Sequence, residues 1–321
     1  MRESITPHNL KKPEDLEETQ RIPRPRLVVD NTHLGDTLEV PMPKTENREA
    51  LRLNYAGGSL VHEGHPDRNE DAMLLDEENR TFGVFDGMGG HDGGDIASRT
   101  AEEYFSKHAE DMKDGGNVEF AKQALKHMMM GAHQAVLERR LKTPGSKMGA
   151  TATVLKFYTD EAGKTWALIA SVGDSRVYRA EEDGNVSQVS EDDDTLKNFF
   201  PDPEEHKAAA KKIANATSTN GFNDIELAAF NNRNVISAAL GTRVESLKII
   251  AVPAERGDRF LLTSDGVHDN LTTDKILEIV RESQSPENIA RNLINKSREH
   301  SRSGQFRAKP DDMTALFVEI K

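Results

Sequence analysis

The chain has 321 residues, no cysteine and a formal net charge of −13 at pH 7. This negative charge argues against nucleic acid or an anionic membrane as a partner, and the lack of cysteine excludes disulfides, thiolate metal sites and a cysteine nucleophile. No apolar run is long enough to span a membrane, and the first residues do not form a signal-peptide pattern. We therefore expect a cytoplasmic protein without membrane contact.

Residues 1–50 differ in composition from residues 51–321. Six of the thirteen prolines lie at positions 7, 13, 23, 25, 41 and 43, among charged residues and few long apolar runs. Such a composition buries too little apolar surface to offset the entropy of ordering the chain. It predicts a disordered or loosely packed extension, with a regulatory tail as the alternative. Residues 51–321 predict a globular domain.

A predicted β-hairpin provides the first candidate site. Residues 71–76 and 81–86 have the pattern of two strands joined by the polar turn 77–80. If Asp76 pairs with Thr81, then Asp71 lies opposite Asp86, with Cβ atoms roughly 5 Å apart. Two carboxylates at this distance repel each other, and a divalent cation between them would turn the repulsion into a binding site. The alternative is a bulge that shifts the register and leaves both acids in solvent.

Helices and strands follow the hairpin in groups. Apolar stripes at helical spacing predict two long helices around residues 97–108 and 121–136, and the methionines at 128–130 are interpreted as core filling. Strands are predicted at residues 150–158, 166–172, 177–180, 186–189, 247–252, 260–266 and 314–320, and helices at 204–216, 274–281 and 286–298. Because strands adjoin strands and do not alternate with helices, we predict an α+β layered sandwich with antiparallel sheets.

Further acidic residues stand at the ends of these strands. Asp174 follows the strand that starts near Trp166, Asp265 closes the strand from Phe260, and Asp311 precedes the final strand. A single Asp-Gly pair is more often an ordinary turn, because both residues suit turn dihedral angles. Their repetition at strand ends is what makes a shared site worth considering.

The segments reached so far resemble the metal-dependent protein phosphatases of type 2C. The resemblance covers about residues 53–321, and the matching segments are 68–72, 84–91, 149–152, 172–178, 233–236, 262–267 and 311–314. Met88 before a glycine pair is similar to the bacterial branch. The resemblance implies a four-layer α-β-β-α sandwich with two central antiparallel sheets. It also implies that residues 191–232 form a flap beside the active site.

The same resemblance implies a site with two Mg²⁺ or Mn²⁺ ions. Asp86 would bridge the ions, the Gly87 carbonyl would bind one of them, and Asp265 and Asp311 would complete the other. Hard divalent cations prefer such carboxylate and carbonyl oxygens. Phosphoserine or phosphothreonine would then be hydrolysed by direct attack of a metal-bridging water, without a phosphoenzyme.

Other acids of the site are expected to act beside the two ions. By resemblance, Glu70 and Asp71 would hold metal-bound waters, so both count as catalytic residues and Asp71 also as part of the metal site. Asp174, with Asp265, matches the position that binds a third, weaker ion in bacterial members.

The chain departs from the family pattern at the phosphate-binding position. The family usually has an arginine four residues before the glutamate, and this chain has Pro66 there. Arg68 lies on the same face of an extended chain as position 66, so we expect Arg68 or His65 to bind the phosphate. The alternative is that phosphate binding is weakened.

Two more departures concern proton transfer and the flap. Met88 stands where animal members have a histidine that serves as general acid, which leaves His91 as a weak candidate beside a metal-bound water. Residues 192–194 form the run Asp-Asp-Asp, which we interpret as solvated.

The resemblance implies a monomeric protein serine/threonine phosphatase whose substrates are phosphorylated proteins and which opposes a serine/threonine kinase. A non-catalytic relative that binds phosphoproteins or acts as a scaffold is the rival hypothesis, favoured only by the missing arginine at position 66. A phosphatase acting on small phosphate esters would keep the chemistry and change the substrate.

Overall fold

The structure is a computed structural model that describes residues 51–321, except 66, 90–92, 182–185, 245–246 and 284. The predicted extension at residues 1–50 lies outside the described residues, as do Pro66 and His91. In the described part of the chain, no helix is both long enough and apolar enough to cross a membrane.

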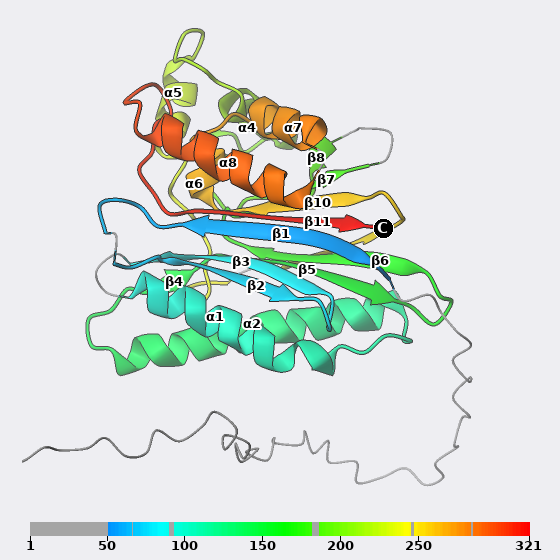
Figure 1. The fold of residues 1–321 in the computed structure, drawn as a ribbon. Helices are drawn as coiled ribbons and strands as arrows, with labels where there is room; N and C mark the ends of the chain where they lie inside the picture. Colours follow the sequence, from blue (N-terminus) through cyan, green and yellow to red (C-terminus); the bar gives the residue numbers. More distant parts are fainter. Residues whose placement is uncertain (1–50, 66, 90–92, 182–185, 245–246, 284) are drawn as a thin grey trace, which may run out of the picture. The chain divides into compact units, whose positions relative to one another are not determined.

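Two sheets form the centre of the domain (Figure 1). In spatial order, the first contains β1 (Leu53–Leu60), β11 (Met313–Ile320), β10 (Arg259–Thr263), β7 (Arg176–Ala180) and β8 (Val186–Gln188). The second contains β2 (Asp71–Asp76), β3 (Thr81–Met88), β5 (Ala152–Thr159), β6 (Thr165–Val172) and β9 (Lys248–Pro253), and β4 (Gly149–Ala150) also pairs with β3. Neighbouring strands among the described residues are antiparallel, which confirms the predicted sheets.

The two sheets pack face to face around an apolar core. Phe82 and Val84 of β3 lie in one cluster with Phe157 of β5, Phe260 of β10 and Val318 of β11. The alternation of side chains along each strand explains this arrangement, because residues at even spacing point to the same face. Burying one face of each sheet against the other brings the ends of β3, β10 and β11 to the same region of the sandwich.

Helices cover the outer faces of both sheets. α1 (Gly94–His108) and α2 (Val118–Lys142) pack on the sheet that contains β3 and β6, and α7 (Thr273–Glu282) and α8 (Pro286–Ser301) pack with α6 (Asp265–His268) on the other (Figure 1). The stripe predicted for α2 is buried along its length, whereas Met130 is exposed. The four-layer α-β-β-α sandwich is therefore confirmed, and Met128 and Met129 fill the core as predicted.

The segment predicted as a flap, residues 191–232, contains three helices: α3 (Leu196–Phe199), α4 (Pro203–Ala214) and α5 (Asp224–Asn231). Asp202 caps α4, and Asn223 forms a capping box with Glu226 in α5. The three helices share a small apolar cluster that includes Leu196, Ile213 and Phe230.

Candidate active site

The hairpin places two carboxylates opposite each other as the sequence predicts. In the register of β2 and β3, Asp71 is the partner of Asp86 and Asp76 is the partner of Thr81. Asp71 is 6% exposed, so the repulsion between the two acids is poorly screened by solvent. The alternative of a shifted register with both acids in water is wrong.

Thr151 fixes the backbone on either side of the Asp86 carboxylate. The amide of Asp86 donates to Thr151 Oγ1 at 3.0 Å, and the amide of Thr151 donates to the Asp86 carbonyl at 2.8 Å. This contact divides the strand predicted at residues 150–158 into β4 and β5. The end of β3 is thus held in place at the point where Asp86 enters the site.

Gly87 permits a close approach of α1 to the end of β3. A Cβ atom at this position would lie 2.1 Å from the carbonyl oxygen of Gly94 and 2.5 Å from that of Glu70. The Gly87 amide donates to the Glu70 carbonyl at 3.0 Å. No side chain fits this position, because the Gly94 and Glu70 backbones close over it.

Asp71 joins the two sheets at this end of the sandwich. Its Oδ2 accepts hydrogen bonds from Ser264 Oγ at 2.8 Å and from Thr314 Oγ1 at 2.6 Å. Ser264 precedes Asp265, and Thr314 lies three residues after Asp311. These bonds draw the ends of β10 and β11 to the hairpin, so acids far apart in the sequence come together.

Asp312 is a buried acidic residue that stabilises the backbone around the site. In the sequence it was noted only as part of the motif 311–314. Its carboxylate accepts from the amide of His62 at 2.5 Å and from the amide of Glu70 at 2.6 Å. The side chain is 2% exposed. Asp312 therefore holds the segment before β2 against β11 and positions Glu70 beside the hairpin.

The acids of the cluster perturb one another strongly. Burial raises the pKa of Asp86 well above its usual range, and repulsion from Asp265, Asp71, Asp311 and Asp174 adds to the effect. Asp174 and Asp265 also have raised pKa values, again chiefly because burial disfavours the charged form. The predicted site residues thus lie within electrostatic reach of one another, and positive charge is needed to keep them ionised.

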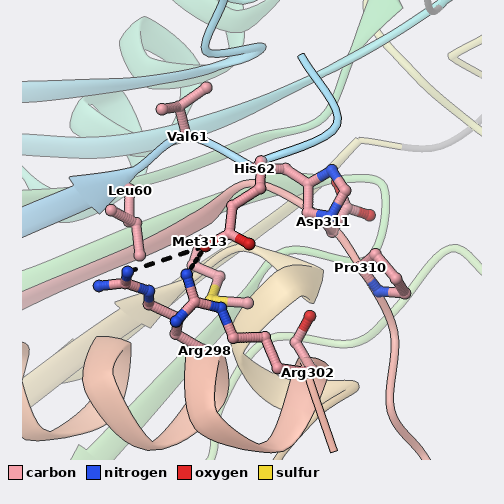
Figure 2. A pocket seen from close by; sticks show the side chains of 10 residues that line it. Leu60, Val61, His62, Arg298, Arg302, Pro310, Asp311 and Met313 are labelled. Carbon is pink, nitrogen blue, oxygen red and sulfur yellow. Dashed lines mark ion pairs between the residues drawn. The ribbon is translucent and has the colours of Figure 1, made fainter. Parts of the chain in front are cut away.

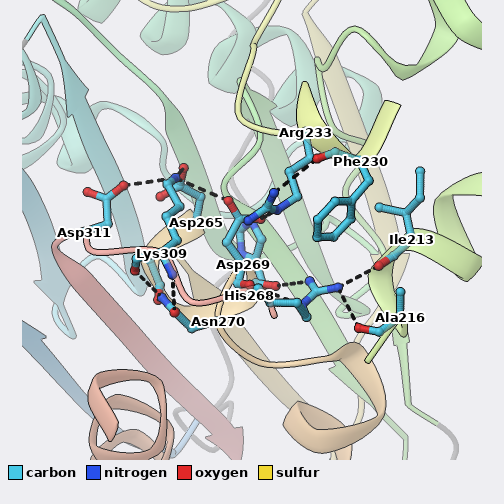
Figure 3. Close-up of polar contacts among 12 residues, drawn as sticks. Ile213, Ala216, Phe230, Arg233, Asp265, His268, Asp269, Asn270, Lys309 and Asp311 are labelled. Carbon is cyan, nitrogen blue, oxygen red and sulfur yellow. Dashed lines mark hydrogen bonds and ion pairs between the residues drawn. The ribbon is translucent and has the colours of Figure 1, made fainter. Parts of the chain in front are cut away.

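Lys309 supplies part of that positive charge (Figure 3). Its Nζ forms ion pairs with Asp265, with Asp311 at 3.0 Å and with Asp269 at 3.3 Å. Burial opposes the charged form of Lys309, but attraction to Asp265 and the two other carboxylates raises its pKa well above the usual range. Lys309 and Asp269 were not predicted from the sequence, although Lys309 stands only two residues before Asp311.

The donor chemistry of the cluster fits a hard divalent cation. Asp265 Oδ1 is buried and has no hydrogen-bond donor, which is costly for a carboxylate oxygen unless a cation or proton approaches it. Across the residues that the structure describes, no group of three or more Asp, Glu or His side chains is spaced as joint ligands of one ion. The fit therefore rests on oxygen chemistry and uncompensated charge, not on a complete ligand shell.

Both residues expected to bind the phosphate, Arg68 and His65, lie in the segment before β2. Arg68 Nη2 lies 2.9 Å from Glu70 Oε1, and its Nε lies 4.0 Å from Asp95 Oδ1. Arg68 also lines an open cavity of about 410 Å³ together with Asp95, Ile96 and Pro144. The Nδ1 atom of His65 is engaged with the Arg68 carbonyl at 2.7 Å, so His65 supports the loop.

A second hollow is lined in part by Asp311 (Figure 2). It has a volume of about 190 Å³ and is lined by Arg298 of α8, by Arg302 directly after α8 and by Glu63. Both arginines form ion pairs with Glu63, so their charge is partly neutralised. Asp311 is the only predicted metal residue among those that line this hollow.

Two arginines connect the acid cluster with the segment predicted as a flap and with the residue that follows it. Arg307 donates to the carbonyls of Ile213 and His268 at 2.7 and 3.1 Å, and also to those of Ala216 and Asp269. Arg233 Nε lies 3.6 Å from Asp269 Oδ1 (Figure 3). Asp269 therefore contacts both Lys309 and Arg233, which directly follows the predicted flap segment.

The expectation of a solvated run at residues 192–194 is wrong. Asp192 forms a two-pronged ion pair with Arg176, and Asp193 is 6% exposed because its carboxylate accepts from the Gly173 amide at 3.1 Å. These acids are needed to anchor the start of the flap segment beside Asp174. A short run of like charges does not reveal such pairing, because the partners lie 16 to 20 residues away.

Related sequences match most of the chain. The sequence model of the protein phosphatase 2C family matches residues 57–297. The serine/threonine protein phosphatase PstP of Mycobacterium tuberculosis is 27% identical over 241 residues, which cover 73% of this chain and 40% of PstP. Protein phosphatase 1L of Bos taurus is 23% identical over 92% of this chain and 80% of its own length.

Solved structures share the fold. The catalytic domain of PstP in complex with two manganese ions superposes with a TM-score of 0.62 at 24% identity, covering 84% of this chain and 98% of that domain. The chain spans less than half of the length of the full PstP proteins that it matches.

Proposed function

Because the chain belongs to the protein phosphatase 2C family, we propose that it is a metal-dependent protein serine/threonine phosphatase. The observation that carries the proposal is the convergence of Asp71, Asp86, Asp174, Asp265 and Asp311, whose charges act on one another at the ends of β3, β10 and β11. A cluster of buried acids is costly to fold. Bound cations would offset this cost.

Two divalent ions are proposed, with Asp86 contacting both. The Gly87 carbonyl would be a further ligand of one ion, and Asp265 and Asp311 would bind the other. Two manganese ions in the PstP catalytic domain support this number. Binding of Mg²⁺ as well as Mn²⁺, and a third, weaker ion at Asp174 and Asp265, are further parts of the proposal. When bound, the ions would acidify water and offset charge on the phosphoryl oxygens.

The protein side chains would bind and orient the substrate. Arg68 would pair with the phosphate, since it lines the open cavity and a guanidinium can form two parallel hydrogen bonds to an anion. Asp71 is held rigidly by Ser264 and Thr314 and would orient water next to Asp86. Glu70, fixed through the Asp312 contact with its amide, would do the same from the other side.

The open cavity beside Arg68 supports a protein substrate over a small ester, because a drug-sized ligand is usually enclosed on most sides. The substrates would be phosphoproteins made by a serine/threonine kinase. A monomeric state, a cytoplasmic location, a separate extension at residues 1–50 and a bacterial-like active site stay predictions from the sequence.

One observation favours the rival, a non-catalytic phosphoprotein-binding relative. Lys309 neutralises Asp265 and Asp311 in part, as it would in a site that never takes up metal. The two functions differ in a simple assay of the purified protein with a phosphothreonine peptide.

The phosphatase proposal predicts turnover with Mn²⁺, loss of turnover in excess EDTA and recovery when Mn²⁺ is restored. Asp86→Asn and Asp265→Asn should each lower turnover by more than about 100-fold. Loss of a residue that only orients a metal ligand costs up to about 100-fold, and these two carboxylates would contact the ions themselves. Glu119→Gln, which removes an exposed carboxylate from the first turn of α2, is the control. Peptide binding without turnover under all metal conditions would support the rival instead.

A further inference from the structure

Lys309 is built into the acid cluster and is not a mobile surface lysine. Its amide donates to Asn270 Oδ1 at 2.9 Å, and its carbonyl accepts from Asn270 Nδ2 at 2.8 Å. Asn270 is 2% exposed and also donates to the Gly266 carbonyl at 2.8 Å. The backbone of Lys309 is thereby clamped to the end of α6, in the same turn that carries Asp265.

The clamp directs the ammonium group at the carboxylates. Lys309 Nζ contacts Asp265, Asp311 and Asp269, and only 15% of its side chain is exposed (Figure 3). An ammonium group is a compact charge with three donors, so it can serve three carboxylates at once. Burying it requires such partners, because an unpaired buried charge is very costly.

Two of these three carboxylates are the ones proposed to hold a divalent ion. A carboxylate that contacts the ammonium has part of its charge neutralised already. An arriving divalent ion would also be repelled by Lys309, because like charges a few ångströms apart interact strongly where solvent is scarce. Uptake of metal must therefore weaken or break the Lys309 contacts.

We propose that Lys309 is a tethered cation that competes with divalent ions for Asp265 and Asp311 and thereby sets the metal affinity of the site. The inference rests on the proposed metal centre. The same carboxylates exchange between two states, one in which they pair with the ammonium group and one in which they bind metal. The site is stable without metal and binds metal less tightly than its acids alone would.

The test is a titration of the metal-free chain with Mn²⁺. Calorimetry measures the binding, and the loss of the electron paramagnetic resonance signal of free Mn²⁺ measures it independently. Lys309→Met removes the charge and keeps the length of the side chain. Lys309→Arg keeps the charge. Lys122→Met, which removes an ion-paired lysine from the surface of α2, is the control for a lost charge elsewhere.

Lys309→Met should bind Mn²⁺ at least about tenfold more tightly than the wild type, a factor that corresponds to about 1.4 kcal/mol. Lys309→Arg and Lys122→Met should stay close to the wild type or bind more weakly. Equal or weaker binding by Lys309→Met, with saturable binding by the wild type, would overturn the inference and leave the metal centre intact. No saturable binding by wild type or variant would overturn the metal centre and the inference together.

Thermal unfolding of the same proteins separates competition from a purely structural role. In EDTA, Lys309→Met should melt below the wild type, because three acids lose their partner, and Mn²⁺ should raise its melting temperature more than that of the wild type. If Lys309→Met is not folded in EDTA, folding on addition of Mn²⁺ supports the inference. Should Lys309→Met and the hydrogen-bonding Lys309→Gln both stay unfolded with Mn²⁺, Lys309 is a structural residue and the inference fails.

Discussion

Replacing Asp71 by Asn should stabilise the metal-free protein. Burial raises the pKa of Asp71 from 3.8 to about 8, although hydrogen bonds from Thr314 and Ser264 act in the opposite direction. The charged form is therefore disfavoured in the folded protein and free in the unfolded chain. An Asn side chain has the same shape, and its Oδ1 can accept the same two hydrogen bonds.

The size of the effect follows from proton linkage. Between about pH 4 and pH 8 the folded protein binds more protons at Asp71 than the unfolded chain, so its stability falls as the pH rises. With pKa values of 3.8 and about 8, the cost is about 4 kcal/mol at pH 7 and about 2 kcal/mol at pH 5. Asp71→Asn removes this cost. Because both pH values lie between the two pKa values, its gain in stability should be about 2.6 kcal/mol larger at pH 7 than at pH 5.

Urea unfolding in EDTA at both pH values measures the gain, since the midpoint and slope give the free energy of unfolding. Asp202→Asn is the matched control, because Asn caps a helix as well as Asp does. With Mn²⁺ present, turnover of a phosphopeptide by Asp71→Asn should fall by about 10- to 100-fold, as for other residues next to metal ligands. A variant that is less stable than the wild type at pH 7, or whose gain does not depend on pH, would refute the reasoning.

Three further substitutions test other parts of the structure. Arg68→Ala should raise the KM for a phosphopeptide by about tenfold, the usual loss for one charged contact to an anion, and an unchanged KM would rule out its role in phosphate binding. Lys156→Met should stabilise the protein by about 3 kcal/mol in urea at pH 7, because burial lowers the Lys156 pKa from 10.5 to about 8. This gain should vanish as the pH rises from 8 to 10.5, and a gain that persists there would contradict the assignment. Arg307→Met should destabilise the protein by about 3 kcal/mol or more, since it leaves buried carbonyls unpaired. Limited proteolysis should then cleave within residues 191–232. An unchanged cleavage pattern would count against Arg307 as the anchor of this segment.

The sequence was sufficient where local patterns determine the structure. The hairpin register follows from side-chain alternation and a short polar turn, so the pairing of Asp71 with Asp86 could be predicted. The buried stripe of α2 follows from helical periodicity in the same way. The convergence of Asp265 and Asp311 on that hairpin came from resemblance to a family, because no local pattern encodes contacts between sheets.

The residues that were missed make their contacts over long sequence separations. Arg307 reaches the Ile213 carbonyl across 94 residues, and nothing in the neighbouring sequence marks it as buried. Lys309 has the composition of an exposed turn, next to Pro310. Asp193 lies in a run of three acidic residues, a pattern that predicts exposure to solvent, yet its carboxylate accepts a hydrogen bond from the Gly173 amide. Pairing of charged groups across elements is a property of the fold, so it becomes visible only with coordinates.

The central claim is that acids from three strand ends hold divalent ions, and anomalous diffraction from a crystal soaked in Mn²⁺ tests it most directly. The account predicts two manganese peaks that share Asp86, one of them also in contact with Asp265 and Asp311, with the Lys309 ammonium withdrawn from those carboxylates. A fully soaked crystal that diffracts well and has no anomalous peak beside Asp86 would contradict it.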